Sequence, residues 1–139
     1  PYDTLMKYPP GTIIDLNQAD TTELKKIPGI GSRIARSIVN HRRLLGGFYQ
    51  IEQLGEIRLK AEKLRSWFSV DAGKIHRINI NKASVERMMH HPYISYYQAK
   101  VIAEYRKKKG KVRDLKQLML YEEFTPADFE RMAPYVCYD

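Results

Sequence analysis

The sequence is poor in the residues and segments on which several classes of protein depend. Its only cysteine among 139 residues is Cys137, which excludes an internal disulfide and a thiolate zinc site of the usual ligand number. No apolar run approaches the roughly 18 residues of a membrane span, nothing resembles a signal peptide, and no stretch alternates as strands do. We therefore expect a helical protein without membrane contact by this fragment, which begins at Pro1 rather than at methionine.

Patterns typical of catalysis are missing too. The sequence has no Gly-x-x-x-x-Gly-Lys loop, no Ser/His/Asp constellation and no carboxylate cluster for metal ions. His90 and His91 lack the further ligands that a metal site requires. The sequence thus predicts a protein that is not an enzyme, with no catalytic residue, no metal ligand, no cofactor and no small-molecule substrate.

Positive charge, by contrast, is abundant. The chain has 24 basic against 16 acidic side chains, a formal net charge of +8, and this excess favours a polyanionic partner. Hydrophobic residues make up 43% and charged residues 29%, which is typical of a folded domain rather than a disordered chain.

The stretch Ile27–Arg36 is the strongest indication of function. Pro28 precedes Gly29 and Gly31, which flank one apolar residue, and a basic helix is expected directly after them. Glycine accepts positive φ and lets another group approach the backbone closely. A helix start presents unpaired N–H groups and the positive end of its dipole. This combination predicts a phosphate-binding turn.

The residues around this turn predict short helices. Asp20 and Glu23 form a capping-box pattern that starts a helix, and Pro28 is expected to end this same helix. The next helix has an apolar face and an opposite polar face, which carries Arg33, Arg36, Asn40 and Arg43. Expected helices cover Thr21–Ile27, Ser32–Arg43, Ile51–Leu54 and Leu59–Phe68.

The second half of the chain repeats the first. Eleven residues recur at one interval of 64 without a gap: Ile14, Asn17, Ala19, Pro28, Ile30, Ala35, Ile38, Arg42, Gly46, Gln53 and Leu54. The interval becomes 68 near the end, because the second copy gains four residues around Tyr121 to Pro126. A repeat fixes the architecture. We expect an all-α fold of two tandem compact units of about four short helices each, at 13–73 and 77–139, after an irregular lead-in at 1–12.

Leu16-Asn17-Gln18-Ala19-Asp20 followed by Ile27-Pro28-Gly29-Ile30-Gly31 resembles the helix-hairpin-helix motif, in the form found in the competence protein ComEA and its bacterial relatives. The resemblance covers both units. It implies hairpins that pair within a unit, with Gly55–Arg58 and Tyr121–Thr125 as degenerate second hairpins, and that bind DNA, preferably double-stranded, without regard to base sequence. Some hairpins of the wider superfamily also bind a monovalent cation through their carbonyls.

By position, the resemblance assigns DNA contacts in the first unit to the backbone N–H groups of Gly29, Ile30, Gly31 and Ser32 and to the side chains of Arg33 and Arg36. In the second unit Tyr93 and Ser95 replace both glycines, and each either adopts an unfavourable positive φ or changes the turn. We expect a weaker grip there, partly offset by the basic residues Lys100, Lys107 and Lys108.

The resulting hypothesis is a protein that binds DNA without sequence specificity, in DNA uptake during competence or in DNA repair. A protein-interaction module built on a degenerate scaffold is one alternative, and a non-catalytic DNA-binding part of a larger repair enzyme is another. Localisation follows the setting: membrane-anchored and outward-facing if the protein is competence-like, and otherwise cytoplasmic.

Overall fold

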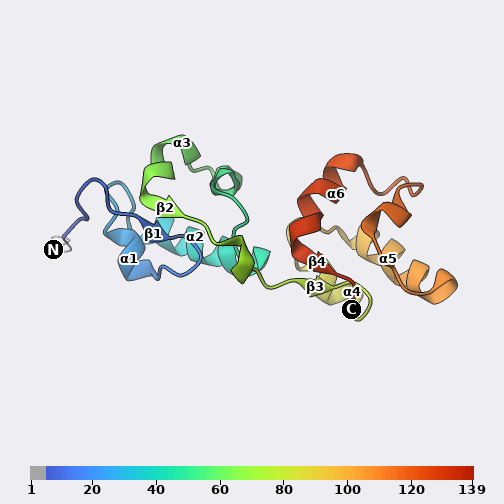
Figure 1. Ribbon diagram of the computed structural model, residues 1–139. Helices are drawn as coiled ribbons and strands as arrows, with labels where there is room; N and C mark the ends of the chain where they lie inside the picture. The colour runs from blue at the N-terminus through green and yellow to red at the C-terminus, as the bar shows by residue number, and fades with distance from the viewer. Residues whose placement is uncertain (1–5) are drawn as a thin grey trace. The chain divides into compact units, whose positions relative to one another are not determined.

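The computed structural model describes residues 6–139, which fold into two compact units. One unit takes in the chain up to Arg43 together with Gly47–Lys74, and the other takes in Leu44–Gly46 together with Ile75–Asp139. Both units are mostly helical (Figure 1), which confirms the all-α prediction. Within the described residues, no helix is long and apolar enough to cross a membrane.

The two units present their elements in nearly the same order, with 3-10 helices labelled η. The first unit contains β1 (Ile14–Asp15), α1 (Thr21–Lys25), α2 (Ser32–Leu45), η1 (Ile51–Ile57), α3 (Ala61–Leu64), η2 (Arg65–Trp67), β2 (Phe68–Ser69) and η3 (Ala72–Lys74). The second contains β3 (Ile78–Asn79), α4 (Val85–Met89), α5 (Tyr96–Lys109), η4 (Leu115–Leu118), α6 (Pro126–Met132), η5 (Ala133–Tyr135) and β4 (Val136–Cys137).

The helix bounds differ from the expected ones at several ends. The helix α1 ends two residues early, at Lys25, and α2 continues to Leu45 before two glycines with positive φ. The single helix expected over Leu59–Phe68 is instead α3, η2 and the start of a strand. Helix ends depend on caps and tertiary contacts more than on the apolar pattern, so these differences are of the usual kind.

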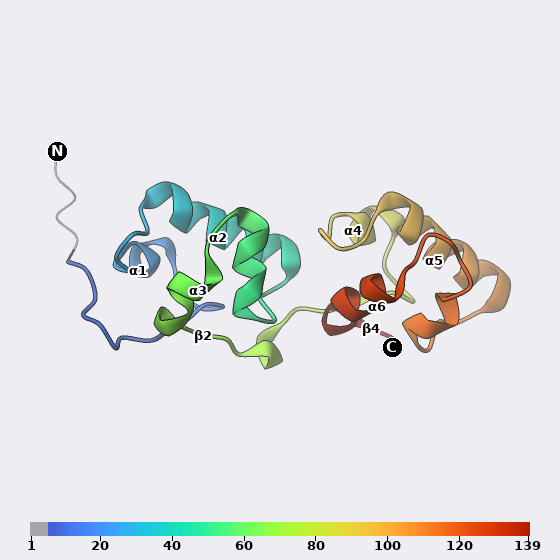
Figure 2. The same cartoon turned by 90° about the horizontal axis from the view of Figure 1, so that it is seen from above.

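Each unit also contains a short parallel strand pair that the sequence did not indicate. In the first unit β1 pairs with β2, with Ile14 opposite Phe68, and in the second β3 pairs with β4, with Ile78 opposite Val136 (Figure 1; β2 and β4 are also labelled in Figure 2). Each strand has two residues, too few for the alternation over about 4–8 residues by which strands are recognised.

One asparagine in each unit links the residues after its first strand to the residues after its long helix. Asn17 Nδ2 donates to Phe48 O (2.9 Å), and its Oδ1 accepts from Phe48 N–H (2.7 Å). Asn81 makes the same two bonds to Val112, both 2.8 Å. Phe48 and Val112 are fully buried, so water cannot replace the side-chain amide. The recurrence of asparagine at the interval of 64 therefore has a structural cause.

A pair of arginines among the repeated residues serves the fold rather than the surface. Arg42 donates from Nη1 to the carbonyls of Leu16 and Ala19, at 3.0 and 2.7 Å. Arg106 makes the equivalent bonds in the second unit, at 3.2 and 2.6 Å. Burial lowers the pKa of the Arg42 guanidinium, although two nearby aspartates act in the opposite direction. Both arginines therefore have a structural role in their unit.

Replacing Asn17 by alanine tests the role of this amide. The variant leaves the buried N–H and C=O of Phe48 without their partner, so we expect the free energy of unfolding to fall by about 2 kcal/mol or more. Urea unfolding followed by circular dichroism measures it. Gln18→Ala, at the exposed neighbouring position, should stay within about 0.5 kcal/mol of wild type. Equal losses in both variants would contradict the assignment.

Candidate nucleic-acid interface

The first hairpin is a tight turn between α1 and α2. The Ile30 N–H donates to Ile27 O (3.1 Å), with Pro28 and Gly29 between them. The φ of Gly29 is +90°, which matches the third residue of a type II turn, where proline is common at the second position. The turn itself thus requires glycine at position 29.

Gly31 is not required by the turn. Its φ lies outside the left-handed region, and a Cβ placed on it would meet no atom within 4 Å. The equivalent residue of the other unit is Ser95, so this backbone position accepts a side chain. Glycine at position 31 leaves open space beside the backbone, where an outside group can approach.

The start of α2 carries N–H groups that have no protein acceptor. Gly31 precedes the helix and has no side chain with which to cap it. Within residues 6–139, no acceptor pairs with the N–H of Gly29, Gly31 or Ser32. The N–H of Ile30, the fourth donor of the expected set, already donates to Ile27 O and closes the turn. Three open donors therefore lie at the positive end of the helix dipole.

Two cations follow on the exposed side of α2. Arg33 and Arg36 are both exposed, and neither has a carboxylate within 4.0 Å among the described residues. Their charge is therefore not neutralised by the protein. Ala35 and Ile38, on the other face of the same helix, are fully buried, which fixes the direction that the two arginines take.

A groove of about 280 Å³ separates this hairpin from the region that follows η1 in the same unit. Its lining residues are Pro28, Gly29, Ile30 and Ile34 on one side and Arg58, Leu59, Lys60, Lys63 and Leu64 on the other. Arg58 has a φ of +65°, the only positive value at a non-glycine residue in the described chain. The sequence places Arg58 in a degenerate second hairpin, but it does not indicate that Arg58, Lys60 and Lys63 are neighbours of the glycine turn.

The second hairpin keeps the turn hydrogen bond but changes the backbone. The Ile94 N–H donates to His91 O (3.1 Å), as Ile30 does to Ile27. Tyr93 does not adopt the positive φ of the equivalent Gly29. The loss of the glycines was expected to cause either an unfavourable positive φ or a changed turn, and the structure has the changed turn.

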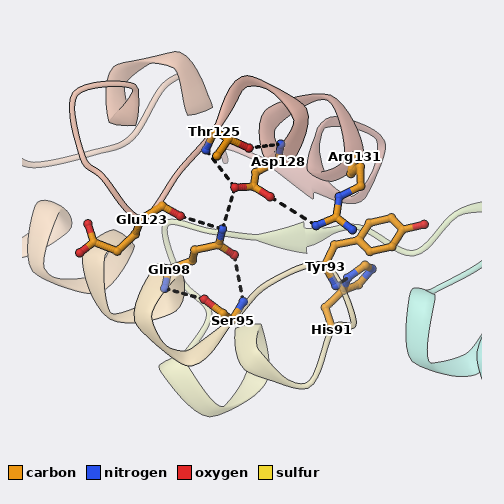
Figure 3. A network of polar contacts seen from close by, with 8 residues as sticks. All are labelled: His91, Tyr93, Ser95, Gln98, Glu123, Thr125, Asp128 and Arg131. Carbon is orange, nitrogen blue, oxygen red and sulfur yellow. Dashed lines mark hydrogen bonds and ion pairs between the residues drawn. The ribbon is translucent and has the colours of Figure 1, made fainter. Parts of the chain in front are cut away.

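The N–H groups of this second hairpin are paired inside the protein (Figure 3). The Tyr93 N–H donates to Nδ1 of His91 (3.0 Å). The Ser95 N–H donates to Oε1 of Gln98 (3.0 Å), as Figure 3 shows. The Gln98 N–H in turn donates to Ser95 Oγ (3.1 Å), which completes a capping box. The counterparts of Gly29 and Gly31 are thus closed here, whereas Tyr96, the counterpart of Ser32, has no acceptor for its N–H among the described residues. From the sequence, His91 is a candidate only as a metal ligand, so this role as an acceptor is missed there.

The closed hairpin is tied to α6 by side chains (Figure 3). Gln98 Nε2 donates to Glu123 O (3.0 Å) and to Asp128 Oδ2 (3.2 Å), and the same carboxylate accepts from the Thr125 N–H (2.9 Å). Burial alone would raise the pKa of Asp128, but hydrogen bonds from Thr125 and Arg131 outweigh it and lower the pKa.

The three lysines expected as contacts in the second unit do not gather at one place. Lys100 is exposed in the second turn of α5, whereas Lys107 and Lys108 are exposed in its last turn. At 1.5 Å per residue, the last turn lies about 18 Å along the helix axis from Ser95. Only Lys100 is near the hairpin. No three metal-ligating side chains of the usual types lie together in the described part of the chain.

A known protein family matches both halves of the chain. The family described as "Helix-hairpin-helix motif" matches residues 10–65 and again residues 73–137. The chain belongs to the helix-hairpin-helix family. Helix-hairpin-helix motifs are DNA-binding motifs, and here two of them stand in tandem. No solved structure matches the chain significantly.

This helix-hairpin-helix chain is also similar to part of some larger proteins. It is 22% identical over 144 residues to "Endonuclease/exonuclease/phosphatase family domain-containing protein 1" of Xenopus laevis, covering 86% of this chain and 26% of that protein. The same-named proteins of Mus musculus and Danio rerio are 24% and 28% identical, with 86% of this chain and 27% and 26% of theirs covered. The chain thus spans about a quarter of these relatives.

The two glycines of the first hairpin make a matched test of fold against site. Gly29→Ala places a Cβ on a backbone with φ of +90°, so we expect the free energy of unfolding to fall by about 1–2 kcal/mol. Gly31→Ser should leave stability unchanged or raise it by a few tenths of a kcal/mol, because serine caps the helix. Urea titration measures both, and a loss at Gly31→Ser as large as at Gly29→Ala would show that the turn needs both glycines.

The network around Asp128 predicts a pH dependence. Because the folded-state pKa is lowered, the carboxylate stabilises the fold above its unfolded pKa, and this contribution is lost as pH falls through the folded pKa. Asp128→Asn should therefore cost about 1 kcal/mol at pH 7, and less at pH 3. Denaturant unfolding at the two pH values measures the difference, with the exposed Glu130→Gln as control. A cost that is independent of pH would refute this role of the charge.

Proposed function

We propose that the first unit binds double-stranded DNA through its hairpin, without regard to base sequence and without catalysis by this chain. The observation that carries the proposal is the contrast between the two hairpins. The N–H groups of Gly29, Gly31 and Ser32 have no acceptor in the described protein, whereas those of Tyr93 and Ser95 are paired internally. Donors without a protein partner at a helix start are suited to a phosphate oxygen.

In the proposed complex, a phosphate lies against the open backbone beside Gly31. The three N–H groups donate to its oxygens, and Arg33 and Arg36 add charge-assisted bonds to that phosphate or its neighbour. These groups reach the sugar-phosphate backbone and not base edges, so they position the protein without reading sequence. The basic residues across the groove, Arg58, Lys60 and Lys63, are placed to meet a further phosphate.

The proposed setting is DNA uptake, by the resemblance to ComEA, or DNA repair. A second candidate follows from the larger relatives: this chain as the non-catalytic DNA-binding part of a larger repair enzyme, because the match covers about a quarter of proteins named for an endonuclease/exonuclease/phosphatase domain. The closed hairpin of the second unit favours protein contact for that unit, where Tyr96 and Tyr97 are 46% and 70% exposed.

Fluorescence anisotropy of labelled duplexes tests the proposal. Wild type should bind unrelated sequences with similar affinity, and the affinity should fall steeply with salt. Arg33→Gln/Arg36→Gln should bind at least tenfold more weakly, and the slope of log K against log salt should become shallower by about 1.8, which is about 0.9 for each phosphate that is no longer neutralised. Gly31→Ser should weaken binding while the fold stays intact.

The control removes the same charge from elsewhere. Arg87→Gln/Lys116→Gln changes two exposed side chains of the second unit and should bind nearly as wild type does. If both double variants lose affinity equally, overall charge and not the first hairpin explains binding. If wild type shows no salt-dependent binding, the DNA proposal fails. An unlabelled single strand as competitor measures the preference for duplex.

A further inference from the structure

The side of the first hairpin that bears carbonyls is in contact with a residue far away in the sequence. Lys7 Nζ donates to Lys25 O, at the end of α1, and lies 3.5 Å from Ile30 O, just beyond the turn. The two carbonyls stand on either side of the Pro28-Gly29 pair. An ammonium group thus bridges the carbonyls of Lys25 and Ile30 across the turn.

The residue after Lys7 fixes the lead-in in this place. The Tyr8 N–H donates to Lys26 O (2.7 Å), and the Lys26 ammonium lies 5.7 Å from the centre of the Tyr8 ring. Residues 6–9 belong to the part expected as an irregular lead-in and have no helix or strand, but they are not merely a connection. Residues 1–5 of that lead-in lie outside the described residues. The backbone contact at Tyr8 holds Lys7 within reach of the hairpin.

This arrangement conflicts with the monovalent metal cation that the family resemblance allows. Such an ion would need backbone carbonyl oxygens of the hairpin, and an ammonium group already takes two of them. Ammonium and a monovalent metal ion use the same lone pairs, so they compete for one place. We propose that Lys7 is the internal cation of the first hairpin and replaces a bound metal ion there.

The proposed role is to act on DNA through the hairpin rather than by direct contact. A positive charge bonded to the carbonyls stabilises the turn and adds to the positive potential at the N–H groups. Continuing the interval of 64 backwards places Asp71 at the position of Lys7. Asp71 itself belongs to the first unit, so the second unit has no counterpart of Lys7 at this interval. Lys7 is a positioning residue, because it need not touch phosphate.

The inference rests on the proposed DNA binding, and the variant Lys7→Met of the full chain tests it. Methionine keeps an unbranched side chain of similar length and removes the charge. In tetramethylammonium chloride, an ion too large for two carbonyls, we expect Lys7→Met to bind duplex at least fivefold more weakly than wild type. The slope of log K against log salt should change by much less than the 0.9 that one directly neutralised phosphate contributes.

Replacing tetramethylammonium by potassium at equal ionic strength should restore part of the affinity of Lys7→Met and leave wild type unchanged. A readout without DNA follows the same logic: potassium should raise the Tm of Lys7→Met above its value in tetramethylammonium, with no such difference in wild type. Lys116→Met, at an exposed position of the second unit, is the control for loss of one charge.

Three results overturn the proposal. The first is binding by Lys7→Met that equals wild type in both salts. The second is a slope for Lys7→Met that falls by about 0.9, which would mean direct phosphate contact, and the third is a response of wild type itself to the identity of the cation. The proposed function fails separately, if wild type does not bind duplex or if Arg33→Gln/Arg36→Gln binds as well as wild type. If Arg33→Gln/Arg36→Gln weakens DNA binding but Lys7→Met does not, the proposed function stands and only the role of Lys7 is refuted.

Discussion

The backbone N–H groups at the start of a hairpin helix must find acceptors, and the differences between the two units follow from how each meets this requirement. The second unit meets it internally, with a histidine nitrogen for Tyr93 and a capping box between Ser95 and Gln98. The first unit has no such groups in place, and Gly31 lacks a side chain altogether. An acceptor from outside the protein is then favoured, and a phosphate oxygen suits both the donors and the dipole.

The duplicated scaffold explains how one fold carries two different surfaces. Asn17 and Arg42, together with their counterparts Asn81 and Arg106, bond buried backbone groups, so they are tied to the fold in both copies. The residues at the hairpins contribute little to that internal bonding and could diverge. The first copy has glycine, arginine and a nearby ammonium, whereas the second has side-chain partners for its own backbone and a link to α6.

Much of the fold could be predicted from the sequence, and less of the site. The repeat, the capping pattern at Asp20 and the apolar face of Ala35 and Ile38 are local or periodic signals, and each corresponds to the structure. The two-residue strands were missed because they are too short to show a pattern. The bond from the Ile30 N–H to Ile27 O was not foreseen, because a motif gives positions and does not reveal which N–H closes the turn. His91 and Lys7 were missed because nothing in their neighbourhood marks their partners.

The sequence by itself determined that this is a helical, duplicated, basic protein with one glycine hairpin kept and one lost. Composition, the repeat interval and the turn residues can all be read directly from the order of the residues. Only the tertiary structure decided which hairpin donors are open, which basic residues line the groove and where the Lys7 ammonium lies. The reason is physical: these contacts join residues far apart in the chain, such as Lys7 with Ile30 and Gln98 with Asp128. Their partners are chosen by the packing of whole elements, which no local pattern records.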